Sequence, residues 1–444
     1  MSGPMDVAER VLERIGDRAE AEVTVTTGHE ALTRFATSFI HQNVADAVRG
    51  IDLRLAVDGR VAEASGNQSD DVSLDRLVQS TLDAAALQPV DPGWPGLAPP
   101  ADAPDADHWD DETATAEPDA RAARVGSFVR AAGDLESAGY CSTEGVEIAF
   151  ANSAGQRLTG RATMAALDGI ARTGTSDGSG RASSRRLADL DGDAIGRVAV
   201  ERATASADAG DLEPGRYEVI LSPDCVLDLL FFLSFYGFNA RAVEEGRSFA
   251  RVGEAQFDES LSLADDVAHP MSAGIGFDAE GTPKRRVELI RRGVTAGLVH
   301  DRRTAKALGA ESTGNAVAGG GSVGAIPANL VLEPGAVSRD QLIGSVERGV
   351  VVTDFWYTRI LDPRTQVVTG LTRNGVWLVE NGRIVRPVAN LRFTQSFVEA
   401  LGPGAVRGIG SDLTLVGGGT FGVGAYALPS LHLASWNFTG NAQG

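Results

Sequence analysis

The sequence predicts an α+β protein, in which an α/β N-terminal domain (residues 1–210) is followed by a β-rich C-terminal domain (residues 211–444). Helical and strand-like runs alternate in the first half, whereas glycine and strand-like runs dominate beyond the turn at Glu213-Pro214-Gly215. The 444 residues, 43% of them hydrophobic, suffice for a sizeable core and indicate two or three domains.

The N-terminal domain opens with an amphipathic helix from about Asp6 to Ile15, because its apolar residues recur at helical spacing. Three strand-like runs are expected, at Glu22–Thr27, Leu32–His41 and Gly50–Glu63. The third is expected to contain a turn at Asp58-Gly59. A second helix is predicted to begin at a Ser73 cap and to end at Leu87.

Composition changes sharply over residues 89–118, where prolines are interleaved with aspartate and glutamate. Such a segment is typical of an extended excursion over the surface without a regular element. Beyond it, a helix is expected at about 119–135, strand-like segments at 139–151 and 157–173, and a further helix near 193–207.

The C-terminal domain begins with a strand-like run and then an apolar helix over Asp224–Phe238. Ser222 can cap this helix, and Pro223 suits its first turn. The run from Cys225 to Phe238 is the most apolar of the chain, but it carries Asp228 and is too short to span a bilayer.

The charge balance excludes two classes of partner. A net charge of −20 and a pI near 4.7 would repel nucleic acid and anionic membrane surfaces.

Only two cysteines occur, Cys141 and Cys225, so no disulfide framework is expected. The charged N-terminus has no apolar core of a signal peptide, and we therefore expect a cytoplasmic protein.

Several phrases of the second half resemble the TldD/PmbA family. They are GRYEVILSPDCVLDLL (215–230), TAKALGAESTGNA (304–316), PANLVLEPG (327–335) and LTRNGVWLVENGRIVRPVANLRFTQS (371–396). The resemblance covers most of residues 211–444 and is looser before them. It implies a mixed N-terminal domain, a β-rich C-terminal domain, and dimers in which TldD pairs with its TldE (PmbA) relative.

Catalytic members of that family carry H-E-x-x-x-H on the helix after the first strand, and a later cysteine completes the zinc site. By alignment, Phe231 stands at the first histidine, Phe232 at the glutamate and Tyr236 at the second histidine, while Phe421 stands at the cysteine. Aromatic rings cannot replace imidazole or thiolate as zinc ligands. The resemblance therefore implies a degenerate site without catalytic residues or metal. A compensating site built from the six scattered histidines is an alternative.

One run has the character of a binding surface: Phe355, Trp356 and Tyr357, followed by Arg359. Aromatic and arginine side chains are favoured where a peptide is gripped. The same run also fits an ordinary half-buried strand.

Together these features predict a non-catalytic, TldE/PmbA-like subunit that pairs with a TldD-like zinc peptidase and helps form its peptide chamber. Zinc is then expected on the partner, and none on this chain. Two other functions fit the sequence: a free-standing peptide-binding or assembly protein, and an enzyme with a site that uses no zinc. Homodimers also remain open, because relatives share one fold.

Overall fold

The computed structural model describes residues 3–418 and 425–442. Its N-terminal part is one six-stranded sheet, in the order β3-β2-β1-β4-β5-β6, with every neighbouring pair antiparallel. The strands are β1 (Glu20–Ala36), β2 (Phe39–Val57), β3 (Arg60–Gly66), β4 (Glu136–Asn152), β5 (Arg157–Arg172) and β6 (Asp177–Ser184). The helices are α1 (Pro4–Ile15), α2 (Asp71–Leu87), α3 (Asp111–Ala114), α4 (Pro118–Ala132) and α5 (Gly192–Ala205).

The C-terminal part holds two sheets, of order β10-β9-β8-β11-β18-β17 and β12-β7-β19-β15-β13-β14. Their strands are β7 (Gly215–Leu221), β8 (Leu263–Asp265), β9 (Val287–Arg291), β10 (Val294–Thr295), β11 (Leu330–Leu332), β12 (Arg348–Asp362), β13 (Val367–Glu380), β14 (Arg383–Pro387), β15 (Leu391–Ser396), β17 (Thr414–Gly418), β18 (Ala425–Leu428) and β19 (Leu431–Asn441), with β16 (Val406–Ile409) paired to β19. The helices are α6 (Pro223–Tyr236), α7 (Ala240–Glu244), α8 (Arg302–Leu308), α9 (Arg339–Gly344) and α10 (Phe397–Ala400).

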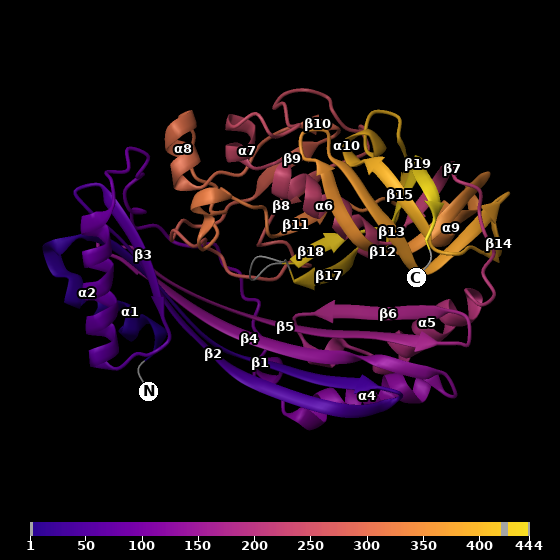
Figure 1. The fold of residues 1–444 in the computed structure, drawn as a ribbon, viewed down its shortest axis with the longest axis horizontal. Coiled ribbons are helices and arrows are strands. Elements are labelled where there is room, and N and C mark those ends of the chain that lie inside the picture. Colours follow the sequence, from indigo (N-terminus) through magenta and orange to yellow (C-terminus); the bar gives the residue numbers. More distant parts are fainter. Residues whose placement is uncertain (1–2, 419–424, 443–444) are drawn as a thin grey trace.

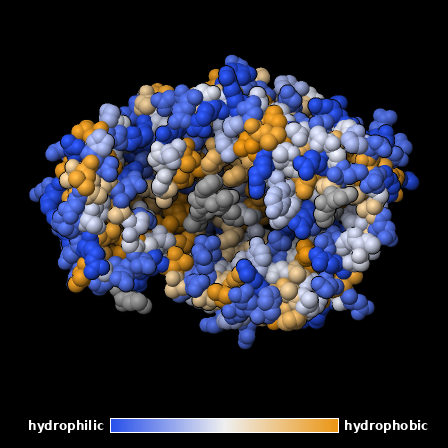
Figure 2. Space-filling model, viewed as in Figure 1, coloured by the Kyte–Doolittle hydropathy of each residue, from blue (hydrophilic) through white to orange (hydrophobic). Residues whose placement is uncertain are grey.

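The long N-terminal sheet lies between its own helices and the C-terminal part (Figure 1). Side chains on one face of its strands pack against α1 and α2 toward one end and against α4 and α5 toward the other. The opposite face looks toward the C-terminal part. In the space-filling view the molecule is hollowed between the two, with hydrophobic residues on the walls (Figure 2).

The expected mixture of helices and strands, with a strand-rich second half, is confirmed. The expected strand Leu32–His41 is wrong, however, because a turn at Thr37 and Ser38 divides it between β1 and β2. Both residues adopt positive φ, 46° and 62°, so the backbone reverses where the composition gives no glycine signal. The turn at Asp58-Gly59 is present between β2 and β3, and β6 is a strand that the sequence did not predict.

Two predicted helix caps are also wrong. Asp70, rather than Ser73, caps α2, and its carboxylate accepts a hydrogen bond from the Ser73 backbone N–H at 3.0 Å. Ser222 precedes α6, but its side chain makes no capping hydrogen bond. Proline at the first turn of α6 is present as expected.

The acidic, proline-rich segment 89–118 is not a plain surface excursion. It contains α3, and it buries Ala98 and His108. Its carbonyls accept hydrogen bonds from both parts of the molecule: Asn152 of β4 donates to Ala98, and Arg302 of α8 donates to Leu97, at 2.8 and 2.7 Å. Through these two hydrogen bonds the segment acts as a strap between the N-terminal sheet and the C-terminal part.

An ionic contact lies beside this strap. Arg54 of β2 contacts Glu22 of the neighbouring strand at 2.6 Å and Glu280 of the C-terminal part at 3.2 Å. The guanidinium also lies 5.1 Å from the centre of the Trp94 ring, which the strap supplies. We call Glu22, Arg54 and Glu280 the β2 junction.

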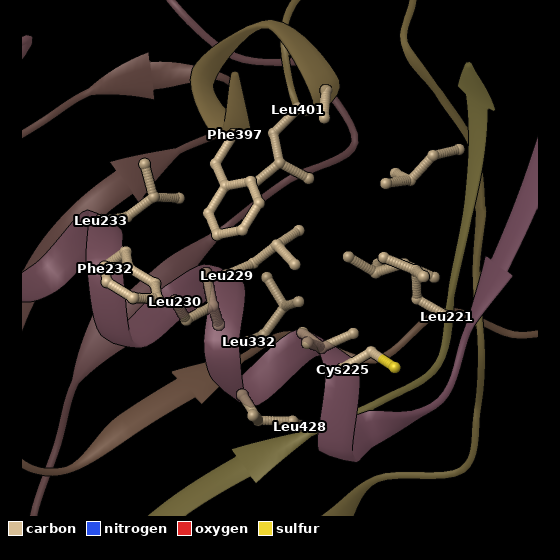
Figure 3. Packing of buried hydrophobic residues seen from close by; sticks show 14 of the residues in the cluster. Leu221, Cys225, Leu229, Leu230, Phe232, Leu233, Leu332, Phe397, Leu401 and Leu428 are labelled. Carbon is tan, nitrogen blue, oxygen red and sulfur yellow. The ribbon is translucent and has the colours of Figure 1, made fainter. Parts of the chain in front are cut away.

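The main core of the C-terminal part forms around α6. Its buried residues come from strands of both C-terminal sheets and from one face of this helix, and they include Leu221, Cys225, Leu229, Leu332 and Phe397 (Figure 3). Cys225 is fully buried in this core, and its thiol donates to the Val352 carbonyl at 3.6 Å. Among the described residues, no helix has the length and apolarity needed to cross a bilayer.

Candidate functional site

The two faces of α6 differ in chemistry. Cys225, Leu229, Phe232 and Leu233 point into the core. Asp224, Asp228, Phe231 and Phe235 recur at helical spacing on the other face, and all four are half-buried. This second face is the candidate site, because it is the less buried side of the helix, although Phe231 also packs against the edge of the core.

The positions aligned with the zinc site lie within a group of stacked rings. Phe232 and Tyr236 are nearly parallel, at an interplanar angle of 8° and a centroid distance of 6.2 Å. Phe231 meets Phe232 edge-on at 5.5 Å and stacks on Phe235 at 5.9 Å. Phe232 also contacts Phe397 of α10 edge-on at 6.0 Å, which ties the rings to the core.

These side chains do not fit a zinc ion, because they offer neither an imidazole nor a thiolate. Phe421, the fourth aligned position, lies outside the described residues. Across the part of the chain that the structure describes, no group of three or more His, Cys, Asp or Glu residues is placed to hold a metal ion. The described positions therefore supply an apolar surface where the family resemblance places zinc ligands.

Near the first half of α6 lies a second ionic contact that the sequence did not predict. Arg181 of β6 contacts Asp168 of β5 at 3.0 Å and Asp354 of β12 at 2.9 Å. Asn374 of β13 donates a further hydrogen bond to Asp354 at 3.1 Å. We call Asp168, Arg181 and Asp354 the β6 junction.

Two carboxyls of α6 face this junction. Burial raises the pKa of Asp224 to about 6, although the charge of Arg181 opposes the shift. Burial also raises the pKa of Asp228 to about 7, and the negative charge of Asp354 adds to the shift. Asp228, an acidic residue inside an apolar helix, was the one signal in the sequence that pointed to this cluster.

The predicted aromatic run is divided by the structure. Phe355 is buried and packs on Phe393 and Trp436, at centroid distances of 4.6 and 5.4 Å, so it does not face a ligand. Trp356 and Tyr357 are exposed, by 45% and 63%. A register shift in the pairing of β12 with β13 at this point accompanies the change from buried to exposed side chains.

Trp356 and Tyr357 line a groove of about 980 Å³ between the β5–β6 turn and the β12–β13 pair. The guanidinium of Arg373 lies 4.5 Å from the centre of the Trp356 ring, and that of Arg359 lies 5.4 Å from the Tyr357 ring. Tyr357 has a φ of 54°, which is unusual for an aromatic residue and is found where surrounding structure over-determines the backbone. Three of the four predicted residues thus stay together at one surface.

Comparisons with known proteins agree with this architecture. The profile of the PmbA/TldA metallopeptidase C-terminal domain matches residues 214–440, about half of the chain. The chain belongs to the PmbA/TldD family. The solved structure of TldE from Thermococcus kodakarensis has a TM-score of 0.87, covers 99% of this chain and 100% of that chain, and is 21% identical. The fold of this PmbA/TldD member is therefore shared over its whole length.

Two curated relatives are also similar. A metalloprotease of Methanothermobacter thermautotrophicus is 28% identical over 287 residues, which cover 60% of this chain and 60% of that protein. A metalloprotease TldD homolog of Buchnera aphidicola is 26% identical over 167 residues, which cover 37% of this chain and 34% of that protein. The matched regions thus span between a third and two thirds of the length of these relatives.

Proposed function

We propose that this PmbA/TldD member is a non-catalytic, TldE/PmbA-like subunit that pairs with a TldD-like zinc peptidase in the cytoplasm and helps form its peptide chamber. The observation that carries the proposal is the chemistry of α6, where Phe231, Phe232 and Tyr236 stand at the aligned donor positions. Peptide hydrolysis by such an enzyme needs an ion to polarise the carbonyl and a carboxylate base to activate water. The rings provide neither, so zinc belongs on the partner.

The rings still leave this chain a role in binding. A peptide chamber needs apolar and aromatic walls that exclude water, and it does not need catalytic groups on every wall. The open face of α6 and the groove at Trp356 and Tyr357 both have this character. We assign the groove to peptide contact within this proposal, with Arg359 and Arg373 holding the two rings in place by cation–π contacts.

The first test is the metal content of the purified chain. We expect less than stoichiometric zinc by elemental analysis after dialysis, because the aligned positions lack donors. One tightly held zinc ion per chain, lost when one of the six histidines is replaced, would contradict the proposal and would favour the compensating site.

The second test is association. Co-expression with the catalytic homologue of the same organism, followed by light scattering on the co-purified material, should give a mixed species rather than two separate ones. A peptidase assay should then show activity that depends on this chain. If the two proteins elute separately at micromolar concentration and activity is indifferent to this chain, a free-standing peptide-binding protein becomes the better account.

The third test addresses the groove. A double substitution Trp356→Ala and Tyr357→Ala should lower peptide affinity or peptidase stimulation at least tenfold, because it removes both exposed rings. The matched control is Leu87→Ala at the end of α2, which removes a side chain that is 86% exposed and far from the groove in sequence. Equal effects of the two changes would remove the groove from the proposal.

A further inference from the structure

A second cavity lies between the N-terminal sheet and the C-terminal part, separate from the groove at Trp356. Its volume is about 320 Å³, at the lower end of the range for small-ligand sites. Strands β1, β2 and β4 form its floor, and residues 275–284 and 315–328 form its roof. Much of the wall is apolar, from Val146, Ile148, Ile275, Phe277 and Ile326.

The floor carries an unusual pair of acids. Glu30 of β1 and Glu144 of β4 are directly opposite each other in the register of these strands, and both line the cavity. Like charges directly opposite each other on paired strands destabilise a sheet, so this pair favours a role other than stability. Burial, together with the charge of Glu30, raises the pKa of Glu144. Among the described residues, neither carboxyl has a hydrogen-bond or ion-pair partner.

The roof adds an unsatisfied acceptor. Asn315 is only 2% exposed, and its amide nitrogen donates to Asp265 at 2.7 Å. Its amide oxygen is buried and accepts no hydrogen bond from any residue that the structure describes. A buried acceptor left without a donor costs about 1–3 kcal/mol, so this oxygen is suited to a ligand that donates.

The overall charge of the lining is negative. The acids Glu30, Asp52, Glu144 and Asp278 line the cavity, and the one lysine among its lining residues is Lys284. The Lys284 ammonium already donates to Asn329 at 2.7 Å, and burial lowers its pKa. An anion would meet unpaired carboxylates here, whereas a cation would relieve the repulsion between Glu30 and Glu144.

We propose that this cavity binds a basic side chain, a lysine or arginine residue of a peptide, with its cation between Glu30 and Glu144 and its aliphatic stem against the apolar wall. A long aliphatic stem ending in a charged head matches a lining that is apolar along its length and acidic on its floor. The choice of a peptide residue, rather than a free amine, rests on the proposed function, since a peptide chamber would present such side chains.

Binding of defined peptides by the isolated full-length chain tests this directly by isothermal titration calorimetry. The probe is a short peptide of glycine, serine and alanine with one central lysine, and the reference replaces that lysine by norleucine, which keeps the stem and removes the charge. We expect at least tenfold tighter binding of the lysine peptide. Equal affinities would overturn the proposal.

The matched variants are Glu144→Gln and Glu147→Gln, which remove one charge each from the same strand. Glu147 is exposed and, three residues on, points to the opposite face of the sheet. Only Glu144→Gln should weaken the lysine peptide about tenfold, with no effect on the norleucine peptide. Its melting temperature should stay equal or rise, because it removes a like-charge contact, so loss of binding will not reflect loss of fold. Equal losses in both variants would refute the site.

Pentylamine distinguishes the two sources of an aliphatic cation. If a basic peptide residue is the occupant, pentylamine should compete only at concentrations far above those of the lysine peptide, and tight binding of the amine with none of the peptide would overturn the assignment. The assay needs no catalytic partner. A mixed complex that forms without any lysine preference would therefore defeat this inference alone, and lysine preference without a mixed complex would defeat the subunit role alone.

Discussion

The β2 junction and the β6 junction join the same sheet to the same C-terminal part on one plan. In each, an arginine of the sheet lies between a carboxylate of a neighbouring strand and a carboxylate of the C-terminal part. Their surroundings differ. At the β2 junction Arg54 has the Trp94 ring beside it, and the side chains of Glu22 and Glu280 are only 5% and 8% exposed.

At the β6 junction two acids of α6 also lie close to the arginine. Asp224 and Asp228 add to Asp168 and Asp354, and Arg202 is the second guanidinium whose charge reaches the cluster. The Arg181 side chain is also more exposed, at 30% against 21% for Arg54. The comparison teaches that one arrangement can serve as a closed clamp at one end and as a more exposed cluster at the other, while both ends include buried carboxyls whose pKa is raised.

The largest expected effect is at the closed clamp. Arg54→Met leaves Glu22 and Glu280 buried without their cation, and breaking a buried pair in this way costs about 3–5 kcal/mol. The free energy of unfolding from urea titration at pH 8 measures the loss. Arg76→Met, which changes an exposed arginine of α2, should cost less than about 0.5 kcal/mol.

The loss of unfolding free energy caused by Arg54→Met should be smaller at low pH. Burial raises the pKa of Glu22 to about 7, so its folded-state pKa lies above its unfolded value. The folded state then holds the extra proton between the two values, and stability falls as pH rises through about 7. At pH 5 Glu22 is protonated and needs its cation less. An equal loss at pH 5 and pH 8 would show that Glu22 is not desolvated.

Arg181→Met should cost less, about 2–3 kcal/mol at pH 8, because Arg181 is partly exposed and Arg202 still balances part of the charge. Urea titration again gives the value, alongside that of Arg54→Met. A loss at Arg181 that exceeds the loss at Arg54 would reverse the comparison and make the β6 junction the stronger clamp.

Asp228→Asn should stabilise the protein by about 2–3 kcal/mol more at pH 8 than at pH 5. Its pKa of about 7 lies above the unfolded value, so wild-type stability declines as this buried carboxyl ionises, by up to about 1.4 kcal/mol per pH unit. Melting curves of both proteins at the two pH values give the difference. The control is Asp134→Asn, at an exposed position after α4, whose stability should not depend on pH in this way.

Trp94→Leu should have the smallest effect, about 0.5–1 kcal/mol, because a partly exposed cation–π contact contributes no more than this. It also removes the hydrogen bond from the indole nitrogen to Glu20 at 2.7 Å. A double-mutant cycle with Arg54→Met should show a coupling of the same size. Zero coupling would mean that the strap supports the β2 junction by packing alone.

Local features of the fold could be predicted from sequence, because their causes lie within a few residues. The helix expected at Asp224–Phe238 is α6, Pro223–Tyr236, and the turn at Asp58-Gly59 follows from its residue types. The turn at Thr37 and Ser38 was missed because positive φ at two such residues is imposed by the pairing of β1 with β2. No periodicity in the sequence reports that constraint.

The candidate site was predicted only in part, for a similar reason. Alignment placed Phe231 and Phe232 on α6, but no pattern could bring Arg181 to Asp354, which lies far along the chain in another sheet. The strap shows the same limit, since Arg302 and Leu97 are separated by 205 positions. Such contacts form when the N-terminal sheet packs against the C-terminal part. Local propensity and residue spacing therefore cannot predict them.

The length of β1 has a mechanical consequence. The β2 junction lies at the level of Glu22, and the β6 junction lies at the level of Arg34, which pairs through Tyr140 with Asp168. At about 3.4 Å per residue, this stretch of strand is about 40 Å long. A strand held at two points can bend between them, but it cannot rotate as a whole about either one. The cavity floor at Glu30 lies within the span between the two junctions. Burial raises the pKa of Glu22 to about 7 at one end and that of Asp228 to about 7 at the other, so a change of pH acts on both ends of this span.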